Sequence, residues 1–202
     1  MKKLAVSLVA ITTLITGLLT AAPAMAAVDP SCTVTYTVDG ATINGTGLGD
    51  IICLDADNLT VNTLGGNDTV IDYGSNNTVN LGDGADDYTG TNGNDGTVNG
   101  GAGNDELIGT PGEDTLTGGD GDDTIIGGEA NDLISGGAGV DNLSGGAGGD
   151  NITGEAGDDT LNGDADSDFL DGGDGDDTLI GGTADDTMRG GNGNDEDRKS
   201  VV

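Results

Sequence analysis

The chain has 202 residues, of which 41 are Gly, 37 are Asp or Glu and only five are Lys or Arg, so its formal net charge is −32. It contains three Tyr, one Phe, no Trp and no His, which excludes an aromatic-rich core, His-based catalytic triads and imidazole zinc sites. The negative charge excludes a nucleic-acid backbone as the expected partner, because such binding needs clustered Lys and Arg.

Residues 1–26 have the three features of a secretory signal peptide. Lys2 and Lys3 form a basic start, residues 4–19 are largely apolar, and Ala24, Met25 and Ala26 form an A-x-A cleavage site. We therefore expect a mature chain that starts at Ala27 and is secreted to the extracellular space. An uncleaved membrane anchor is disfavoured because the apolar run is short, and no other segment is predicted to span a membrane. Cleavage leaves three basic residues against 37 acidic ones, which predicts a cation as the partner.

Cys32 and Cys53 are the only cysteines. In an oxidising compartment, an even and closely spaced pair predicts one disulfide, whereas a metal-thiolate site would need more ligands. We expect this disulfide to hold the start of the mature chain to the first part of the fold.

A nine-residue repeat divides the mature chain into residues 27–99, a degenerate N-terminal solenoid or cap, and residues 100–196, a regular array. In the array, Gly recurs every ninth residue from Gly100 to Gly190. Asp follows five residues later, and an apolar residue follows two residues after that, from Leu107 to Met188. Alternate Asp residues form two series: the first row is Asp105, Asp123, Asp141, Asp159, Asp177 and Asp195, and the second row is Asp114, Asp132, Asp150, Asp168 and Asp186.

The same phase runs more weakly through residues 27–99 if one extra residue is allowed within residues 90–99. The apolar position then falls on Ile43, Ile52, Val61, Val70, Val79 and Tyr88. The Asp position keeps Asp50, Asp68, Asp86 and Asp95, but it holds Leu59 and Asn77 as well. We expect this segment to continue the solenoid with little or no calcium.

One apolar residue in nine cannot form an amphipathic helix. A strand of about three residues around the apolar position, followed by a turn of six Gly-, Asp- and Asn-rich residues, fits the pattern. Two nonapeptides then make one coil, and the stacked coils form two short parallel sheets facing each other. One buried aliphatic side chain contributes roughly 1.5–3 kcal/mol, whereas ordering nine residues costs on the order of 9–18 kcal/mol. Stacked carboxylates about 4.8 Å apart would also repel, unless a divalent cation lay between them.

The segment Gly100–Ile108 matches the nonapeptide G-G-x-G-x-D-x-U-x, as do Gly118–Ile126, Gly136–Ser144 and Gly172–Ile180. The array therefore resembles the RTX (hemolysin-type) calcium-binding repeat. The resemblance implies an all-β fold, a right-handed parallel β-roll or β-solenoid with two nonapeptides per turn. It also implies that each Ca²⁺ lies between one turn and the next turn on the same side, two nonapeptides further on, where carboxylates of both Asp residues and turn carbonyls bind it. Carried over to both rows, this gives about nine Ca²⁺ sites, and it adds the turn glycines Gly103, Gly121, Gly139, Gly157 and Gly175 to the metal-binding residues.

The two rows differ at the fourth position of the repeat. This position is Gly throughout the first row, but in the second row it holds Ala130, Asp166 and Ala184 as well as Gly. If the position needs a positive φ, a Cβ there costs about 1–2 kcal/mol. We therefore expect the first row to hold calcium more tightly.

Other motifs are weaker. The run Asp164-Ala-Asp166-Ser-Asp168 resembles the start of an EF-hand loop, but Phe169 and Gly175 stand where Gly and Glu are required. Paired acids such as Asp176 and Asp177 could suggest glycosidase chemistry, but in a repeating array they are better explained as metal ligands or solvated turn charges. We expect no enzyme activity in this stretch.

Residues 197–202 abandon the repeat. They match the translation of a common sequencing-adapter sequence, so we expect a non-native tail and a natural protein that continues beyond Glu196; a natural polar cap is the alternative. The chain would then be a secreted calcium-binding β-roll protein, the N-terminal fragment of a larger secreted RTX enzyme or toxin, or a calcium-rigidified surface adhesin. The sequence identifies no protein or glycan partner.

Overall fold

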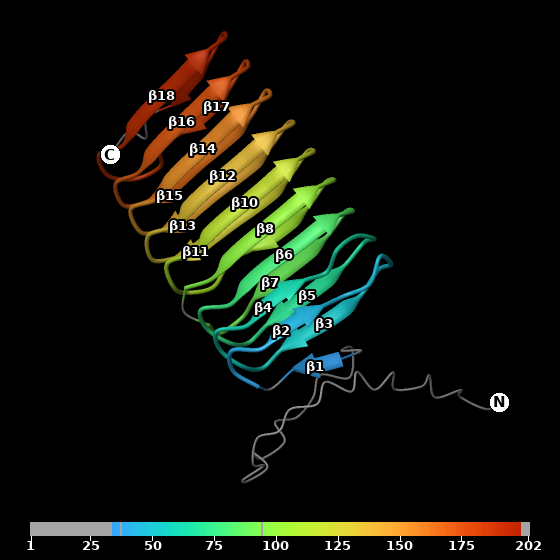
Figure 1. Ribbon diagram of the computed structural model, residues 1–202. Coiled ribbons are helices and arrows are strands. Elements are labelled where there is room, and N and C mark those ends of the chain that lie inside the picture. The colour runs from blue at the N-terminus through green and yellow to red at the C-terminus, as the bar shows by residue number, and fades with distance from the viewer. Residues whose placement is uncertain (1–33, 37, 94, 199–202) are drawn as a thin grey trace, which may run out of the picture.

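The computed structural model describes residues 34–36, 38–93 and 95–198. These residues form nineteen strands and no helix, and therefore no helix long and apolar enough to cross a membrane. Every strand pairing is parallel, and the strands alternate between two sheets. Figure 1 shows the coils stacked side by side along one axis, from the blue N-terminal coils to the red C-terminal ones.

The odd-numbered strands form a ten-stranded sheet: β1 (Val34–Tyr36), β3 (Ile51–Leu54), β5 (Thr69–Asp72), β7 (Asp87–Gly90), β9 (Glu106–Ile108), β11 (Thr124–Glu129), β13 (Asn142–Ala147), β15 (Thr160–Ala165), β17 (Thr178–Ile180) and β19 (Glu196–Arg198). The even-numbered strands form a nine-stranded sheet: β2 (Thr42–Asn44), β4 (Thr60–Asn62), β6 (Thr78–Asp83), β8 (Thr97–Ala102), β10 (Thr115–Asp120), β12 (Leu133–Ala138), β14 (Asn151–Ala156), β16 (Phe169–Asp174) and β18 (Thr187–Asn192).

The register of both sheets follows the repeat. Ile125 of β11 pairs with Leu107 of β9 on one side and with Leu143 of β13 on the other, and each partner lies two nonapeptides away in the sequence. The apolar position of every coil from Ile43 to Leu179 points inward and is at most 4% exposed, so the two sheets enclose one continuous ladder of aliphatic side chains that Tyr88 alone interrupts. The predicted β-solenoid of two nonapeptides per coil is confirmed.

The strands are longer than the sequence predicted. In the middle of the array they have six residues, such as Thr115–Asp120, and they run through the Gly pair that was assigned to the turn. Pairing skips Gly118 and resumes with Gly119, which faces Gly137 and has a φ of 123°. The chain therefore bends at the Gly pair without leaving the sheet, and only about three residues remain for the turn.

The solenoid continues into residues 38–93 with the extra residue in the expected place. Thr78 pairs with Thr97 and Asp87 with Glu106, so the spacing of both pairs is two nonapeptides plus the inserted residue. The assignment of Asp95 to the Asp position was wrong, because Gly96 occupies that position and donates its N–H to Oδ1 of Asp114. Asp95 is exposed and has a φ of 51°.

Several sequence predictions fall on residues outside the described part. The signal peptide (residues 1–26), Cys32 and residues 199–202 are among them. Cys53 is buried in β3, where it pairs with Thr35 of β1, three residues after Cys32 in the sequence. The Cys32–Cys53 disulfide stays a prediction, as does the division of the chain at residues 99 and 100.

Candidate metal centres

The two Asp rows lie along opposite edges of the solenoid. First-row residues such as Asp123 directly precede a strand of the ten-stranded sheet, and second-row residues such as Asp132 directly precede a strand of the nine-stranded sheet. Figure 1 shows these turns stacked along both edges. Asp195 and Asp186, at the C-terminal ends of the rows, are half-buried; the other nine row residues are at most 3% exposed.

One oxygen of each carboxylate joins two coils. The backbone N–H of Asp105 donates to Oδ1 of Asp123 at 2.8 Å, and the same bond recurs in all nine gaps within the two rows, at 2.8–3.2 Å. The predicted geometry, in which Asp residues two repeats apart approach one another, is therefore present. Oδ1 is, however, already an acceptor for a protein amide.

The other oxygen has no partner within the protein. Among the described residues, Oδ2 is buried and accepts no hydrogen bond in Asp68, Asp86, Asp105, Asp123, Asp132, Asp141, Asp150, Asp159, Asp168 and Asp177. A buried carboxylate oxygen without a partner is costly unless a cation compensates it. Ten such atoms in a repeating geometry indicate a repeating ligand.

In the array, most of these oxygens lie against the first Gly of their own repeat and beside a carbonyl oxygen of the next coil, and this set of oxygens is here called the cradle. A Cβ placed on Gly118 would overlap Oδ2 of Asp123 and lie 2.7 Å from the carbonyl oxygen of Gly136 in the next coil. The corresponding points beside Gly100, Gly136 and Gly127 lie 2.6, 2.9 and 2.6 Å from a carbonyl oxygen of the next coil, again beside the carboxylate of their own repeat. Carboxylate and carbonyl oxygens thus converge where only glycine leaves room.

The surroundings disfavour the charged carboxylates. Burial raises the pKa of Asp105, Asp132 and Asp168 to about 7 and that of Asp123 and Asp159 to about 6, and neighbouring row carboxylates add repulsion. The hydrogen bond from the preceding coil acts in the opposite direction. A cation beside these carboxylates would offset both the cost of burying their charge and the repulsion between them.

The donor set fits a hard cation. The unpartnered atoms are carboxylate oxygens, the converging backbone groups are carbonyls, and oxygen-only ligation is the preference of calcium. Within residues 38–93 and 95–198, no cluster of three or more His, Cys, Asp or Glu side chains is arranged to hold a metal. The oxygens that do converge are a carboxylate and a main-chain carbonyl, as beside Gly118.

The predicted turn glycines occupy positions with a positive φ, where a Cβ would meet backbone atoms of the preceding coil. Gly121 has a φ of 130°, and its N–H donates to the carbonyl of Ala138 in the next coil at 2.7 Å. Gly103, Gly139, Gly157 and Gly175 repeat both features. The second-row residues Ala130, Asp166 and Ala184 also have positive φ, of 70°, 73° and 84°, so the expectation that this position needs a positive φ is confirmed for them.

Asp114 differs from the rest of its row in a way the periodicity did not predict. Thr110 replaces the second Gly of that repeat, and its N–H and hydroxyl both donate to the Asp114 carboxylate. Thr46 makes the same two bonds to Oδ2 of Asp50. Where Thr follows the first Gly, hydrogen-bond donors therefore take up the oxygen that is unpartnered elsewhere.

The first row also extends further toward the N-terminus than the predicted metal ligands. Asp68 and Asp86 join the same ladder, with bonds of 2.7 Å from Asp68 N to Asp86 Oδ1 and 2.9 Å from Asp86 N to Asp105 Oδ1. The sequence already indicated their place in this row, because both keep the Asp position of the nine-residue repeat. Their cradles are altered, however, because the buried residues Thr63 and Leu81 stand where the array has its first Gly.

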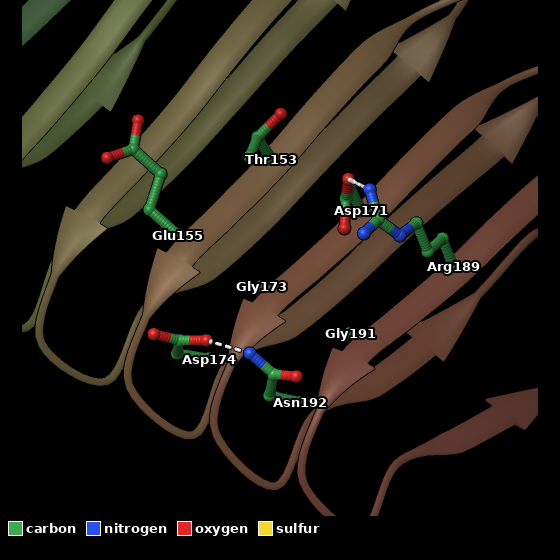
Figure 2. Close-up of a pocket in the computed structure, with 8 residues that line it drawn as sticks. All are labelled: Thr153, Glu155, Asp171, Gly173, Asp174, Arg189, Gly191 and Asn192. Carbon is green, nitrogen blue, oxygen red and sulfur yellow. Dashed lines mark hydrogen bonds and ion pairs between the residues drawn. The ribbon is translucent and has the colours of Figure 1, made fainter.

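A shallow hollow of about 250 Å³ lies on the C-terminal coils, lined by Thr153, Glu155, Asp171, Gly173, Asp174, Arg189, Gly191 and Asn192. Figure 2 shows two pairs across neighbouring strands, Arg189 with Asp171 at 3.2 Å and Asn192 with Asp174 at 2.6 Å. These polar groups are partnered with one another, in contrast to the buried Oδ2 atoms.

A family model for the RTX calcium-binding nonapeptide repeat matches the chain in four copies, over residues 62–96, 99–134, 135–170 and 162–196. Comparisons with curated proteins and with solved structures found no match. The four copies span most of the solenoid and both Asp rows. Together with the parallel coils and the repeated carboxylate cradles, they show that the chain belongs to the RTX calcium-binding nonapeptide repeat family.

Proposed function

We propose that this chain is a secreted protein that binds Ca²⁺ between successive turns and folds into its solenoid as it does so. The observation that supports this most strongly is the series of buried Oδ2 atoms without a hydrogen-bond partner. Calcium would supply the missing positive charge, and the Asp carboxylates with the nearby Gly carbonyls would hold it.

The charge of the protein favours the same conclusion. The chain carries 37 acidic and five basic residues, and the described residues contain only two ion pairs, Arg189 with Asp171 and Arg198 with Glu196. Basic side chains of the chain itself therefore cannot neutralise the two rows. Cations from solution can, which couples metal binding to folding because the unfolded chain does not hold the sites.

The array predicts about eight strong sites, one for each array residue from Asp105 to Asp177 whose Oδ2 is buried and unpartnered. This is one fewer than the nine gaps of the two rows, because Thr110 occupies the carboxylate of Asp114. We propose a structural role for these sites and no catalytic one, since the same side chains recur in every coil.

The proposal is tested by counting the ions. The chain from Ala27 onward would be stripped of metal and titrated with Ca²⁺ and, separately, with Mg²⁺ by isothermal titration calorimetry and equilibrium dialysis. We expect about eight Ca²⁺ per chain and much weaker Mg²⁺ binding, because Mg²⁺ demands tighter octahedral geometry. Binding of one or two ions, or equal binding of both metals, would contradict the proposal.

A further inference from the structure

We propose that residues 41–93, here called the N-terminal coils, hold their fold without a cation and form the preformed end onto which the calcium-bound coils of the array add. This inference rests on the calcium-dependent folding proposed above. It concerns the order in which the solenoid forms, and the hydrogen bonds of Asp72 and Asn77 that chiefly support it lie on the edge opposite the first row.

Asp72 stands at the position that is the first Gly of the repeat in the array, since it pairs with Gly90 in the register of β5 and β7. Its carboxylate is 2% exposed and accepts bonds from Gly74 N at 2.8 Å, from Asn77 Nδ2 at 2.8 and 3.0 Å, and from the Tyr88 hydroxyl at 3.2 Å. Hydrogen-bond donors of the protein thus surround this buried carboxylate. None of the ten unpartnered Oδ2 atoms has such a donor.

Asn77 takes over the part of a row carboxylate on this edge. It stands at the Asp position of its repeat, and its Oδ1 accepts the N–H of Leu59 at 2.7 Å, as the row carboxylates accept an N–H from the preceding coil. Its amide group donates to Asp72 and to the carbonyl of Ala56. The Asn77 amide oxygen thus joins two coils as a row carboxylate does. Its N–H₂ group donates hydrogen bonds to the buried Asp72 carboxylate, which therefore does not need a cation.

Apolar side chains take these two positions in the preceding coil of this edge, between β3 and β4. Leu54 and Leu59 occupy the positions that hold Gly and Asp in the array, and both are at most 1% exposed. Leu81 does the same on the other edge. The N-terminal coils therefore bury aliphatic side chains at positions that hold Gly or Asp in the array as well as at the apolar position, whereas the array buries one apolar residue per repeat.

Polar ladders add to this on the outer face of the nine-stranded sheet. Asn62 donates to Asn44 at 3.2 Å, and Asn80 donates to Asn62 at 3.0 Å, so three successive coils are joined by side-chain amides that need no metal. Only Asp68 and Asp86 retain a buried unpartnered oxygen in the N-terminal coils, against eight residues in the array. The cost of folding without calcium is therefore concentrated in the array.

A preformed end changes how the rest of the solenoid forms. Each coil of a solenoid contacts only its neighbours. The first coil of an isolated array would therefore have to order both of its strands with no folded coil beside it. The last two N-terminal strands provide edges on which the array can pair: β6 pairs with β8 through Thr78 and Thr97, and β7 pairs with β9 through Asp87 and Glu106. The array can then add one coil at a time as calcium binds.

The test is hydrogen exchange of the chain from Ala27 onward, followed by mass spectrometry, in metal-stripped buffer and with saturating Ca²⁺. Without calcium we expect slow exchange for peptides covering β3 to β7 and fast exchange for peptides covering β11 to β17. With calcium both should be slow. If the array is calcium-dependent but the N-terminal coils also exchange fast without calcium, the inference is wrong. If calcium changes neither region, the proposed function fails instead.

A charge-matched pair of variants makes the test specific. Asn77→Asp removes the amide donors and places a second carboxylate against Asp72, so protection of β3 to β7 without calcium should fall by roughly tenfold or more. Asn76→Asp adds the same charge one residue earlier, at an exposed position whose positive φ Asp also tolerates, and it should leave the protection unchanged. Equal loss in both variants, or loss in neither, would overturn the assigned role of the Asp72–Asn77 pair.

Discussion

Adding a methyl group at the first Gly of one repeat tests whether the oxygens packed against that Gly hold the cation. In Gly118→Ala the new Cβ would overlap Oδ2 of Asp123 and lie 2.7 Å from the carbonyl oxygen of Gly136. The methyl group therefore collides with two of the oxygens that we propose hold the ion and must displace them, so one site should be lost. At a calcium concentration a hundred times the dissociation constant, one site stabilises the folded state by about 2.7 kcal/mol, or roughly a hundredfold in the folded-to-unfolded ratio.

Calorimetric titration would count the ions, and thermal unfolding at fixed calcium, followed by circular dichroism, would measure the stability. Gly118→Ala should bind one Ca²⁺ fewer and unfold at a lower temperature. Asp123→Asn removes the charge without adding volume and should lose the same ion. Gly47→Ala is the control, because no atom lies within 4 Å of the added Cβ. If Gly118→Ala binds the full number of ions with unchanged stability, the location of the site is wrong.

Three further predictions follow from the same geometry. Asp141→Asn, in the first row, should weaken calcium-induced folding more than Asp132→Asn, because the second row carries the strained residue Ala130; equal losses in a calcium titration would count against this difference between the rows. In metal-stripped protein, β structure measured by circular dichroism should increase as the pH falls from about 7 toward 4. Burial raises the pKa of Asp105, Asp132 and Asp168 to about 7, so the folded state binds more protons in this window, and that stability is lost as the pH rises through 7; no response to acid would refute this reasoning. Reduction of the predicted Cys32–Cys53 disulfide should increase hydrogen exchange near β1 and β3 while calcium binding by the array persists. If reduction unfolds the whole calcium-loaded array, this prediction is wrong.

The architecture could be predicted from the sequence because a solenoid is specified by its period. Gly, Asp and an apolar residue recur at fixed offsets, and those offsets place Ile125 between Leu107 and Leu143 without any long-range information. Strand length was underestimated because Gly119 and its equivalents were assigned to turns, whereas they pair in the sheet with positive φ. The composition of a Gly pair does not reveal which of its two residues bends the chain.

The details of the sites depend on where single side-chain atoms lie, and a periodic pattern does not contain that information. Asp114 kept the phase of its row, yet Thr110 takes up its carboxylate. Asp72 broke the pattern, yet it forms the most fully hydrogen-bonded buried carboxylate of the N-terminal coils. In both cases a substitution at a Gly position changes which donors reach the carboxylate, and only the folded coil shows it.

Calcium binding should fold the array, and a calcium titration of the metal-stripped chain from Ala27 onward tests this most directly. Far-UV circular dichroism and small-angle X-ray scattering would be recorded at each calcium concentration. We predict an expanded, largely disordered array without calcium, and a cooperative gain of β signal with compaction as the sites fill. A chain that is fully compact, with its complete β signal in excess chelator at pH 7.5, would contradict the account.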